Sequence, residues 1–194
     1  MEEKEKMLSG LLYDANYDKS LIDERTKCKS LCVLYNSLPP ANIDERNKII
    51  KKILGSTKEN FLIEQPFYCD YGYNISIGEN FYANHNLIIL DPGKVEFGDN
   101  VFIGPNCAFY TPQHPLDFET RNKGLEYAFP IKVGNNVWFG GNVVVLPGVS
   151  IGDNSVIGAG AVVTKNIPPN VIAVGNPCRV IRKITEKDKI KFEV

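Results

Sequence analysis

His114 is the side chain in this sequence best suited to take up a proton at neutral pH. It lies in the segment TPQHPLD, close to Pro112 and Pro115, and the chain has only one other histidine. An imidazole has an ordinary pKa near ~6.5, so it accepts protons from attacking hydroxyl groups. The prolines restrict the local backbone and would aim the ring. We therefore predict that His114 is a catalytic general base.

The second histidine, His85, follows Asn84 in the segment FYANHN. Its ring either faces solvent or lies near a seam between subunits, and its role stays open. Two histidines cannot supply a three-histidine zinc site. The count therefore argues against a zinc enzyme of the carbonic anhydrase type.

Five cysteines occur at wide spacing, without a CxxC pair. Cys28 and Cys32 stand four residues apart on an expected helix, which is the spacing of half a metal site. The others are Cys69, Cys107 and Cys178. Small residues in a reduced cytosolic protein are the simpler interpretation, so we expect no metal.

A six-residue repeat in the second half of the chain would position the histidine. An aliphatic residue or phenylalanine followed by glycine recurs, and IKVGNNVWFGGNVVVLPGVSIGDNSVIGAGAVVTKN holds six hexads without a break. A period of six fits neither an ordinary helix nor an alternating strand. It fits a mainly β solenoid with three short flat faces per turn, so that three hexads close one coil. A conventional β-sandwich would not keep this register over six hexads.

The positions within each hexad have separate tasks. One position faces the narrow triangular interior, and we expect a compact aliphatic side chain there. Gly, Asn and Asp gather at the turns, as in GEN, GDN and GNN. These residues tolerate left-handed backbone conformations, so they predict the corners of the solenoid.

Two interruptions break the register. Near Asp91-Pro92-Gly93 the step between inward positions is eight residues instead of six. Between Phe109 and Val133 the step is 24, so 18 residues beyond the expected six leave the solenoid and return. Long loops on a rigid scaffold tend to be functional. We therefore predict that loop 111–130, which contains the histidine, carries the chemistry.

The sequence pattern divides the chain into three parts. We expect a helical segment over 1–58, the β-helix over 59–184 and a tail over 185–194, with a short helix capped by Thr185. Within the first part, helices are expected in the first twelve residues and over 20–34. A third helix would begin at Asn42, with Glu45 completing a capping box.

Composition excludes several classes of protein. Among 194 residues, 22 are Lys or Arg and 23 are Asp or Glu, which leaves a net charge of -1 and argues against a general nucleic-acid or membrane-surface binder. No apolar run approaches the ~20 residues that span a bilayer. The start, MEEKEKMLSG, lacks the apolar core of a secretory signal. We therefore expect a cytoplasmic protein.

Several segments resemble one enzyme family over nearly the whole chain. They are DYGYNISIGENFYAN (70–84), IGPNCAFYTPQHPLD (103–117), the long repeat from 134 to 170, VGNPCRVIRKI (174–184) and EKEKMLSGLLYDAN (3–16). Together they are similar to the maltose/galactoside O-acetyltransferases, to which the nodulation acetyltransferases are related. The resemblance implies a left-handed parallel β-helix of hexapeptide repeats that assembles as a homotrimer. It also implies direct acetyl transfer from acetyl-CoA to a sugar hydroxyl, at sites between neighbouring subunits.

The resemblance also assigns catalytic and acceptor-binding positions. It makes His114 the base and Asn84 a residue that holds the acceptor or stabilises the oxyanion. Acceptor contacts are expected from Asp70, Tyr82, Asp91 and one of Asp14 and Asn16, between which the choice stays open. Glu126, on the returning arm of the loop, either orients His114 or is solvated.

The donor positions implied by the resemblance follow along the later coils. They are Trp138, Gly141, Ala159, Thr164, Lys165, Arg179 and Arg182. Small residues would let the pantetheine arm approach the backbone, and the basic residues would meet the CoA phosphates. Trp138 would line the acceptor or pantetheine site, or pack between subunits.

Two alternatives stay open. One is an antibiotic acetyltransferase with the same solenoid and loop histidine, although such enzymes usually lack the helical N-terminal segment. The other is a non-catalytic solenoid that serves as a scaffold or sugar-binding module. The sequence names neither the physiological sugar nor the preferred acyl chain.

Overall fold

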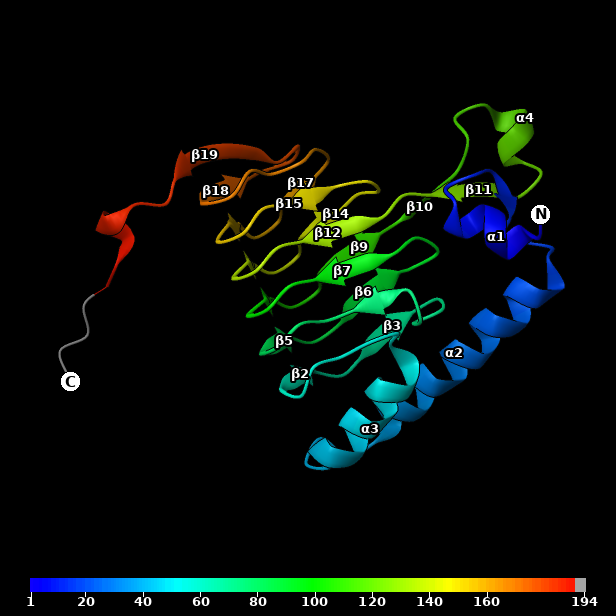
Figure 1. Ribbon diagram of the computed structural model, residues 1–194, viewed down its shortest axis with the longest axis horizontal. Helices are drawn as coiled ribbons and strands as arrows, with labels where there is room; N and C mark the ends of the chain where they lie inside the picture. Colours follow the sequence, from blue (N-terminus) through cyan, green and yellow to red (C-terminus); the bar gives the residue numbers. More distant parts are fainter. Residues whose placement is uncertain (191–194) are drawn as a thin grey trace.

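The computed structural model describes residues 1–190 and shows a three-sided parallel β-helix with two long helices across one end (Figure 1). The predicted mainly β solenoid is confirmed. Its coils advance from the helical end toward the C-terminus, where the last strand turns back antiparallel.

Three sheets form the sides of the solenoid. The four-stranded sheet contains β4 (Ile75–Ser76), β7 (Val95–Phe97), β12 (Ile131–Val133) and β15 (Ser150–Ile151). The five-stranded sheet contains β3 (Phe67–Cys69), β6 (Leu87–Leu90), β9 (Ala108–Tyr110), β14 (Val144–Val145) and β17 (Val162–Val163). The seven-stranded sheet contains β2 (Phe61–Ile63), β5 (Phe81–Ala83), β8 (Phe102–Ile103), β13 (Trp138–Phe139), β16 (Val156–Ile157), β18 (Val171–Val174) and the antiparallel β19 (Arg179–Lys183).

Two of the corners between these sheets hold most of the expected site residues. The Asn84 corner joins the seven-stranded to the five-stranded sheet and consists of residues 84–86, 104–107, 140–143 and 158–161. The loop corner joins the five-stranded to the four-stranded sheet and consists of residues 70–74, 91–94, 111–130, 146–149 and 164–166.

Strand pairing confirms both predicted interruptions. Val133 pairs on one side with Ile151, which is 18 positions later, the length of one regular coil. On the other side it pairs with Phe97, which is 36 positions earlier, because the 18 extra residues of the loop lie between these two neighbouring strands. Tyr82 pairs with Phe102, 20 positions ahead, because two extra residues lie at 91–93.

The interior is filled by aromatic as well as aliphatic side chains. Phe81, Phe97, Phe109 and Phe139 stack edge to face along the axis, with ring centroids 5.2, 5.0 and 5.3 Å apart. The prediction that inward residues must be compact aliphatics is therefore wrong at these positions. Successive rings fit because perpendicular packing lets the edge of one meet the face of the next.

Asparagine forms the corners, as the turn residues predicted. Eight asparagines adopt a left-handed backbone with φ between 53° and 63°. Five of them line the corner between the four- and seven-stranded sheets and join side chain to side chain at 2.8–3.1 Å, namely Asn80, Asn100, Asn136, Asn154 and Asn170. An asparagine accepts this conformation at lower cost than most residues, and its amide pairs with the next coil.

Two N-terminal helices, α2 (Lys19–Ser37) and α3 (Ile43–Ile53), close the first coil by packing on the end of the solenoid that begins with β2 and β3 (Figure 1). The short helix α1 (Glu3–Leu8) instead packs beside the returning arm of the loop, residues 125–128. The expected capping box at Asn42 and Glu45 is wrong, because the Asn42 side chain makes no capping hydrogen bond.

The loop 111–130 folds back on the N-terminal segment. It contains β10 (Pro112–Gln113), α4 (Phe118–Arg121) and β11 (Leu125–Ala128). β11 pairs antiparallel with β10 on one side and with β1 (Tyr13–Asp14) on the other. This small sheet was not predicted, and it holds the histidine loop against the start of the chain.

At the C-terminal end, Glu186–Asp188 form the 3-10 helix η1, which Thr185 caps as expected, while the last part of the expected tail, 191–194, lies outside the described residues. No helix within residues 1–190 is both long and apolar enough to cross a membrane.

Candidate active site

The loop fixes the ring of His114 in one tautomer. Its Nδ1 lies 2.9 Å from the carbonyl oxygen of Leu125 on β11. A carbonyl only accepts, so Nδ1 carries the hydrogen and Nε2 keeps a lone pair in the neutral ring. The side chain is 44% exposed, which leaves Nε2 accessible. His114 can thus accept a proton at Nε2.

Glu126 lies beside that nitrogen. Its Oε1 is 3.4 Å from His114 Nε2, and its Oε2 accepts a hydrogen bond of 2.9 Å from the Tyr13 hydroxyl. Burial, and then the neighbouring carboxylate, raise the pKa of Tyr13 far above its usual value. The tyrosine therefore stays a hydroxyl that holds Glu126 toward the histidine. Tyr13 was missed from sequence, since only the pairing of β1 with β11 brings it here.

Asp70 and Asp91 both lie at the loop corner but in different surroundings. Asp70 is partly exposed, and its Oδ1 is 3.7 Å from the Lys29 ammonium. Asp91 is fully buried; its Oδ1 accepts from the backbone N–H groups of Asp70 and Tyr71, and Oδ2 has no partner. Because the Asp91 side chain has no exposed surface, the structure does not support the expected direct contact with the acceptor, and the carboxylate holds the Asp70-Tyr71 turn instead.

Asp14 and Asn16 also lie next to the loop. The Asp14 carboxylate accepts from the backbone N–H groups of Asn16 and Tyr17, so it stabilises a local turn. Asn16 is exposed and lies against Gly124, where a Cβ would come within 2.7 Å of the Asn16 side-chain nitrogen. The side chain of Asn16 is thus more available than that of Asp14 to contact an acceptor.

The Asn84 corner borders a shallow groove of about 440 Å³ on the seven-stranded sheet. Tyr82, Phe102 and Trp138 pair across successive strands and line it. Phe102, 50% exposed, was missed from sequence, although it occupies the same position in its hexad as Trp138.

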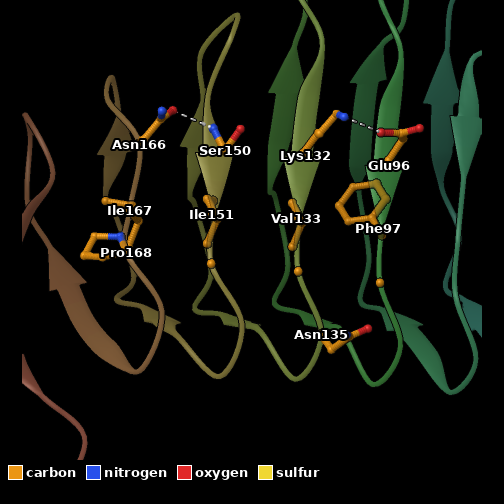
Figure 2. A pocket seen from close by; sticks show the side chains of 13 residues that line it. Glu96, Phe97, Lys132, Val133, Asn135, Ser150, Ile151, Asn166, Ile167 and Pro168 are labelled. Carbon is orange, nitrogen blue, oxygen red and sulfur yellow. Dashed lines mark hydrogen bonds and ion pairs between the residues drawn. The ribbon is translucent and has the colours of Figure 1, made fainter.

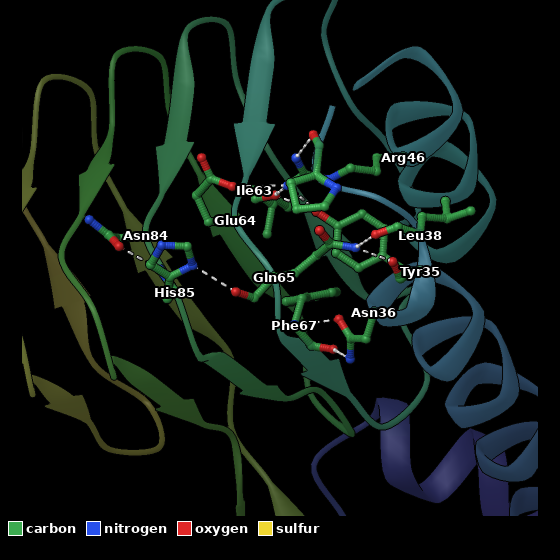
Figure 3. Close-up of polar contacts among 11 residues, drawn as sticks. Tyr35, Asn36, Leu38, Arg46, Ile63, Glu64, Gln65, Phe67, Asn84 and His85 are labelled. Carbon is green, nitrogen blue, oxygen red and sulfur yellow. Dashed lines mark hydrogen bonds and ion pairs between the residues drawn. The ribbon is translucent and has the colours of Figure 1, made fainter. Parts of the chain in front are cut away.

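The amide of Asn84 is oriented at the edge of this groove. Its Oδ1 accepts from the backbone N–H of His85 at 2.7 Å, so Nδ2 points away and can donate (Figure 3). The His85 ring in turn donates from Nδ1 to the Gln65 carbonyl at 2.7 Å, and Gln65 donates to the Tyr35 and Leu38 carbonyls at the end of α2. His85 therefore connects this corner to the end of α2 through Gln65, which is a structural role.

The expected donor residues fall in two groups. Gly141 and Ala159 lie on successive coils of the Asn84 corner. Arg179 and Arg182 lie on β19, the last strand of the seven-stranded sheet that borders this corner. Arg182 is held by two hydrogen bonds, 2.7 and 2.8 Å long, to the Asp188 carboxylate. Thr164 and Lys165, in contrast, follow β17 at the loop corner and are exposed.

The structure thus separates His114 from Asn84 within one chain. His114 belongs to the loop corner and Asn84 to the other edge of the five-stranded sheet. His114, Glu126, Asp70 and Asn16 lie at or beside the loop corner, and Asn84 lies at the edge of its groove at the other corner. A single protomer thus keeps the two halves of the expected site apart.

Another hollow, of about 750 Å³, lies on the outer face of the four-stranded sheet (Figure 2). Two contacts between neighbouring coils use polar side chains of this hollow: Lys132 pairs with Glu96 at 3.5 Å, and Asn166 accepts from the Ser150 N–H at 2.8 Å. None of the expected site residues lines it, so its size alone does not make it the site.

Comparisons with known proteins agree with this architecture. The maltose acetyltransferase hexapeptide capping motif matches residues 6–58, and the bacterial transferase hexapeptide family matches residues 130–165. The galactoside O-acetyltransferase of Escherichia coli is 48% identical over 185 residues, which cover 95% of this chain and 91% of that protein. The chain belongs to the maltose/galactoside O-acetyltransferase family.

Solved structures of this family superpose closely on the chain. A maltose O-acetyltransferase from Clostridium difficile 630 is 54% identical, with a TM-score of 0.94 and coverage of 96% of this chain and 99% of that one. A galactoside acetyltransferase in complex with coenzyme A is 46% identical, with a TM-score of 0.94 and coverage of 100% and 96%. The predicted family and its hexapeptide-repeat β-helix are therefore confirmed.

Proposed function

We propose that the protein transfers the acetyl group of acetyl-CoA to a hydroxyl group of a sugar, with His114 as general base. The carrying observation is the fixed tautomer of His114: Nδ1–H is held by the Leu125 carbonyl, so in the neutral ring the lone pair is on Nε2, which faces Glu126 Oε1 at 3.4 Å. Family membership supports acetyl transfer, and the coenzyme A complex of a relative supports the donor.

In this mechanism the acceptor hydroxyl attacks the thioester carbonyl directly. Nε2 of His114 takes the hydroxyl proton, and Glu126 stabilises the imidazolium that forms. The free amide of Asn84 donates to the developing oxyanion, a contact worth ~3 kcal/mol in comparable sites. The C–S bond of the thioester then breaks, and CoA leaves as its thiol with the proton that His114 returns to the sulfur. The acetyl group stays on the sugar, so no cysteine takes part.

We place the complete site between two protomers of a homotrimer. The two halves lie at different corners of one solenoid, so the loop corner of one protomer would meet the Asn84 corner of its neighbour. Such a junction also converts a shallow groove into an enclosed cleft, which a small-molecule site needs.

On the donor side, CoA would run along the Asn84 corner. Its pantetheine arm would pass Trp138, Gly141 and Ala159, and its phosphates would meet Arg179 and Arg182. Thr164 and Lys165 lie at the loop corner, so they would reach the donor from the neighbouring protomer. On the acceptor side, Asp70, Tyr82 and Asn16 would hold the sugar. We keep the cytoplasm as its location, because all five cysteines are free thiols, which a reducing compartment preserves.

The activity is tested by mixing the protein with acetyl-CoA and a panel of maltose, glucose, galactosides and chloramphenicol, and following free thiol release. Turnover with a sugar is expected. Turnover with chloramphenicol alone would establish the antibiotic enzyme instead, and absence of both turnover and CoA binding would establish a scaffold. His114→Ala should lose most turnover but keep CoA affinity.

The shared site has its own test. His114→Ala and Asn84→Ala should each be inactive alone, but in mixed trimers one of three interfaces has both side chains intact. Random mixing at equal amounts should therefore restore roughly a quarter of wild-type activity, because three quarters of a cyclic trimer population is mixed. No recovery after refolding the mixture would contradict a site between protomers.

A further inference from the structure

Three cysteine sulfurs meet in the interior between α2 and the first strand of the five-stranded sheet. Cys28 and Cys32 lie one helical turn apart on α2, and Cys69 ends β3. The Cys69 sulfur is 3.5 Å from that of Cys28 and 3.8 Å from that of Cys32, and all three lie within 4.8 Å of one another. Each residue is at most 5% exposed.

This spacing matches a three-coordinate ion. With metal–sulfur bonds of ~2.3 Å, an ion at the centre of three thiolates holds the sulfurs ~4.0 Å apart. Within the described chain, no histidine nitrogen or carboxylate oxygen joins the three sulfurs at this spacing. An all-sulfur donor set selects soft ions over hard ones.

We propose that Cys28, Cys32 and Cys69 bind one soft, thiophilic metal or metalloid ion through three sulfur bonds. Cys107 and Cys178, which are also buried, show the contrast, because neither belongs to the cluster. The site is independent of the acetyl-transfer chemistry and lies on the helical side of the loop corner.

The sulfur of Cys69 lies within hydrogen-bond distance of both others, and either thiol of each pair can donate. The three thiols therefore already face one another before an ion binds. Cys28 also lines a hollow of about 290 Å³ beside Tyr71 and Ile53, which offers a path toward the sulfurs.

Charge selects among soft ions. Three thiolates with a monovalent ion carry two negative charges, with a divalent ion one, and with a trivalent ion none. The neighbouring Asp91 already has a pKa raised by burial, so the surroundings disfavour added negative charge. Arsenite, As(OH)₃, gives a neutral product: three As–O bonds are replaced by three As–S bonds, and each thiol proton leaves with a hydroxide as water, without oxidation or reduction.

The test adds arsenite or Cd²⁺ to the intact, reduced protein under anaerobic conditions. We expect one ion per chain by native mass spectrometry, with a sulfur-to-metal charge-transfer absorption for Cd²⁺. Cys28→Ser, Cys32→Ser and Cys69→Ser should each weaken binding at least a hundredfold, whereas Cys107→Ser and Cys178→Ser should not.

A second measurement needs no variant. In the wild-type protein, bound ion should slow alkylation of Cys28, Cys32 and Cys69 but leave the rates at Cys107 and Cys178 unchanged, as read by peptide mass spectrometry. The proposal is overturned if neither ion binds stoichiometrically, or if binding protects the wrong cysteines. Cadmium binding at the three sulfurs without arsenite binding would overturn the charge argument.

Discussion

The buried carboxyl group of Asp91 should make the stability of the fold depend on pH. Asp91 is 0% exposed, and Oδ1 accepts from the Asp70 and Tyr71 N–H groups at 3.0 and 2.8 Å. These bonds favour the carboxylate, but burial outweighs them, and the pKa of Asp91 rises from 3.8 to about 7. The unpartnered Oδ2 is the structural sign of that imbalance.

The sign and size of the effect follow from this shift. The folded protein keeps the Asp91 proton up to pH about 7, whereas the unfolded chain loses it near 3.8. The contribution of Asp91 to the free energy of unfolding is therefore fully present below about pH 4, and it is lost as the pH rises to 7. At 1.36 kcal/mol per pKa unit, the loss is on the order of 4 kcal/mol.

Asp91→Asn removes the titration while keeping an oxygen for the two backbone N–H groups. The free energy of unfolding of the variant, minus that of the wild type, should increase by on the order of 4 kcal/mol as the pH is raised from 4 to 8. Denaturant unfolding at one fixed protein concentration measures this difference, since assembly would otherwise shift it. Asp23→Asn, on the exposed face of α2, is the control and should show no such trend. An Asp91→Asn difference that does not change with pH would refute the reasoning.

Three further changes test the site by steady-state kinetics. Glu126→Gln should lower kcat about tenfold and leave KM for acetyl-CoA unchanged, because a neutral amide stabilises protonated His114 less than a carboxylate does; an unchanged kcat would leave Glu126 as a solvated residue. Trp138→Ala should raise KM for acetyl-CoA about tenfold through lost apolar contact, with kcat retained; loss of kcat together with loss of trimer assembly would point to packing between subunits instead. Asp188→Asn frees Arg182 and should lower KM for acetyl-CoA about twofold at low salt, and this gain should vanish at high salt; a rise in KM would mean that the ion pair positions β19.

Features set by spacing along the chain were accessible from sequence. The hexad period predicted the solenoid, and the 24-residue step from Phe109 to Val133 predicted the loop that carries His114. The turn residues predicted the corners, where asparagine amides join successive coils. Each of these depends on a local rule that repeats, so single errors do not destroy the signal.

Features that depend on distant segments meeting were not accessible. The pairing of Tyr13 with Glu126 spans 113 residues and rests on a two-residue strand with no periodicity. Cys69 joins Cys28 and Cys32 only because α2 packs along β3. Asp91 was expected to contact the acceptor, but its carboxyl group is fully buried under the Asp70-Tyr71 turn. In each case the deciding fact is a contact between elements.

The start of the chain helps to orient the histidine. β10 and β11 alone would form a two-stranded ribbon, which is marginally stable in water. β1 adds a third strand, and the buried Tyr13 hydroxyl holds Glu126 at 2.9 Å. Because Glu126 and the Leu125 carbonyl are the two contacts of the His114 ring, its orientation depends on the N-terminal segment as well as on the loop. The repeat supplies regular faces and corners, but this one aperiodic pairing determines where Nε2 points.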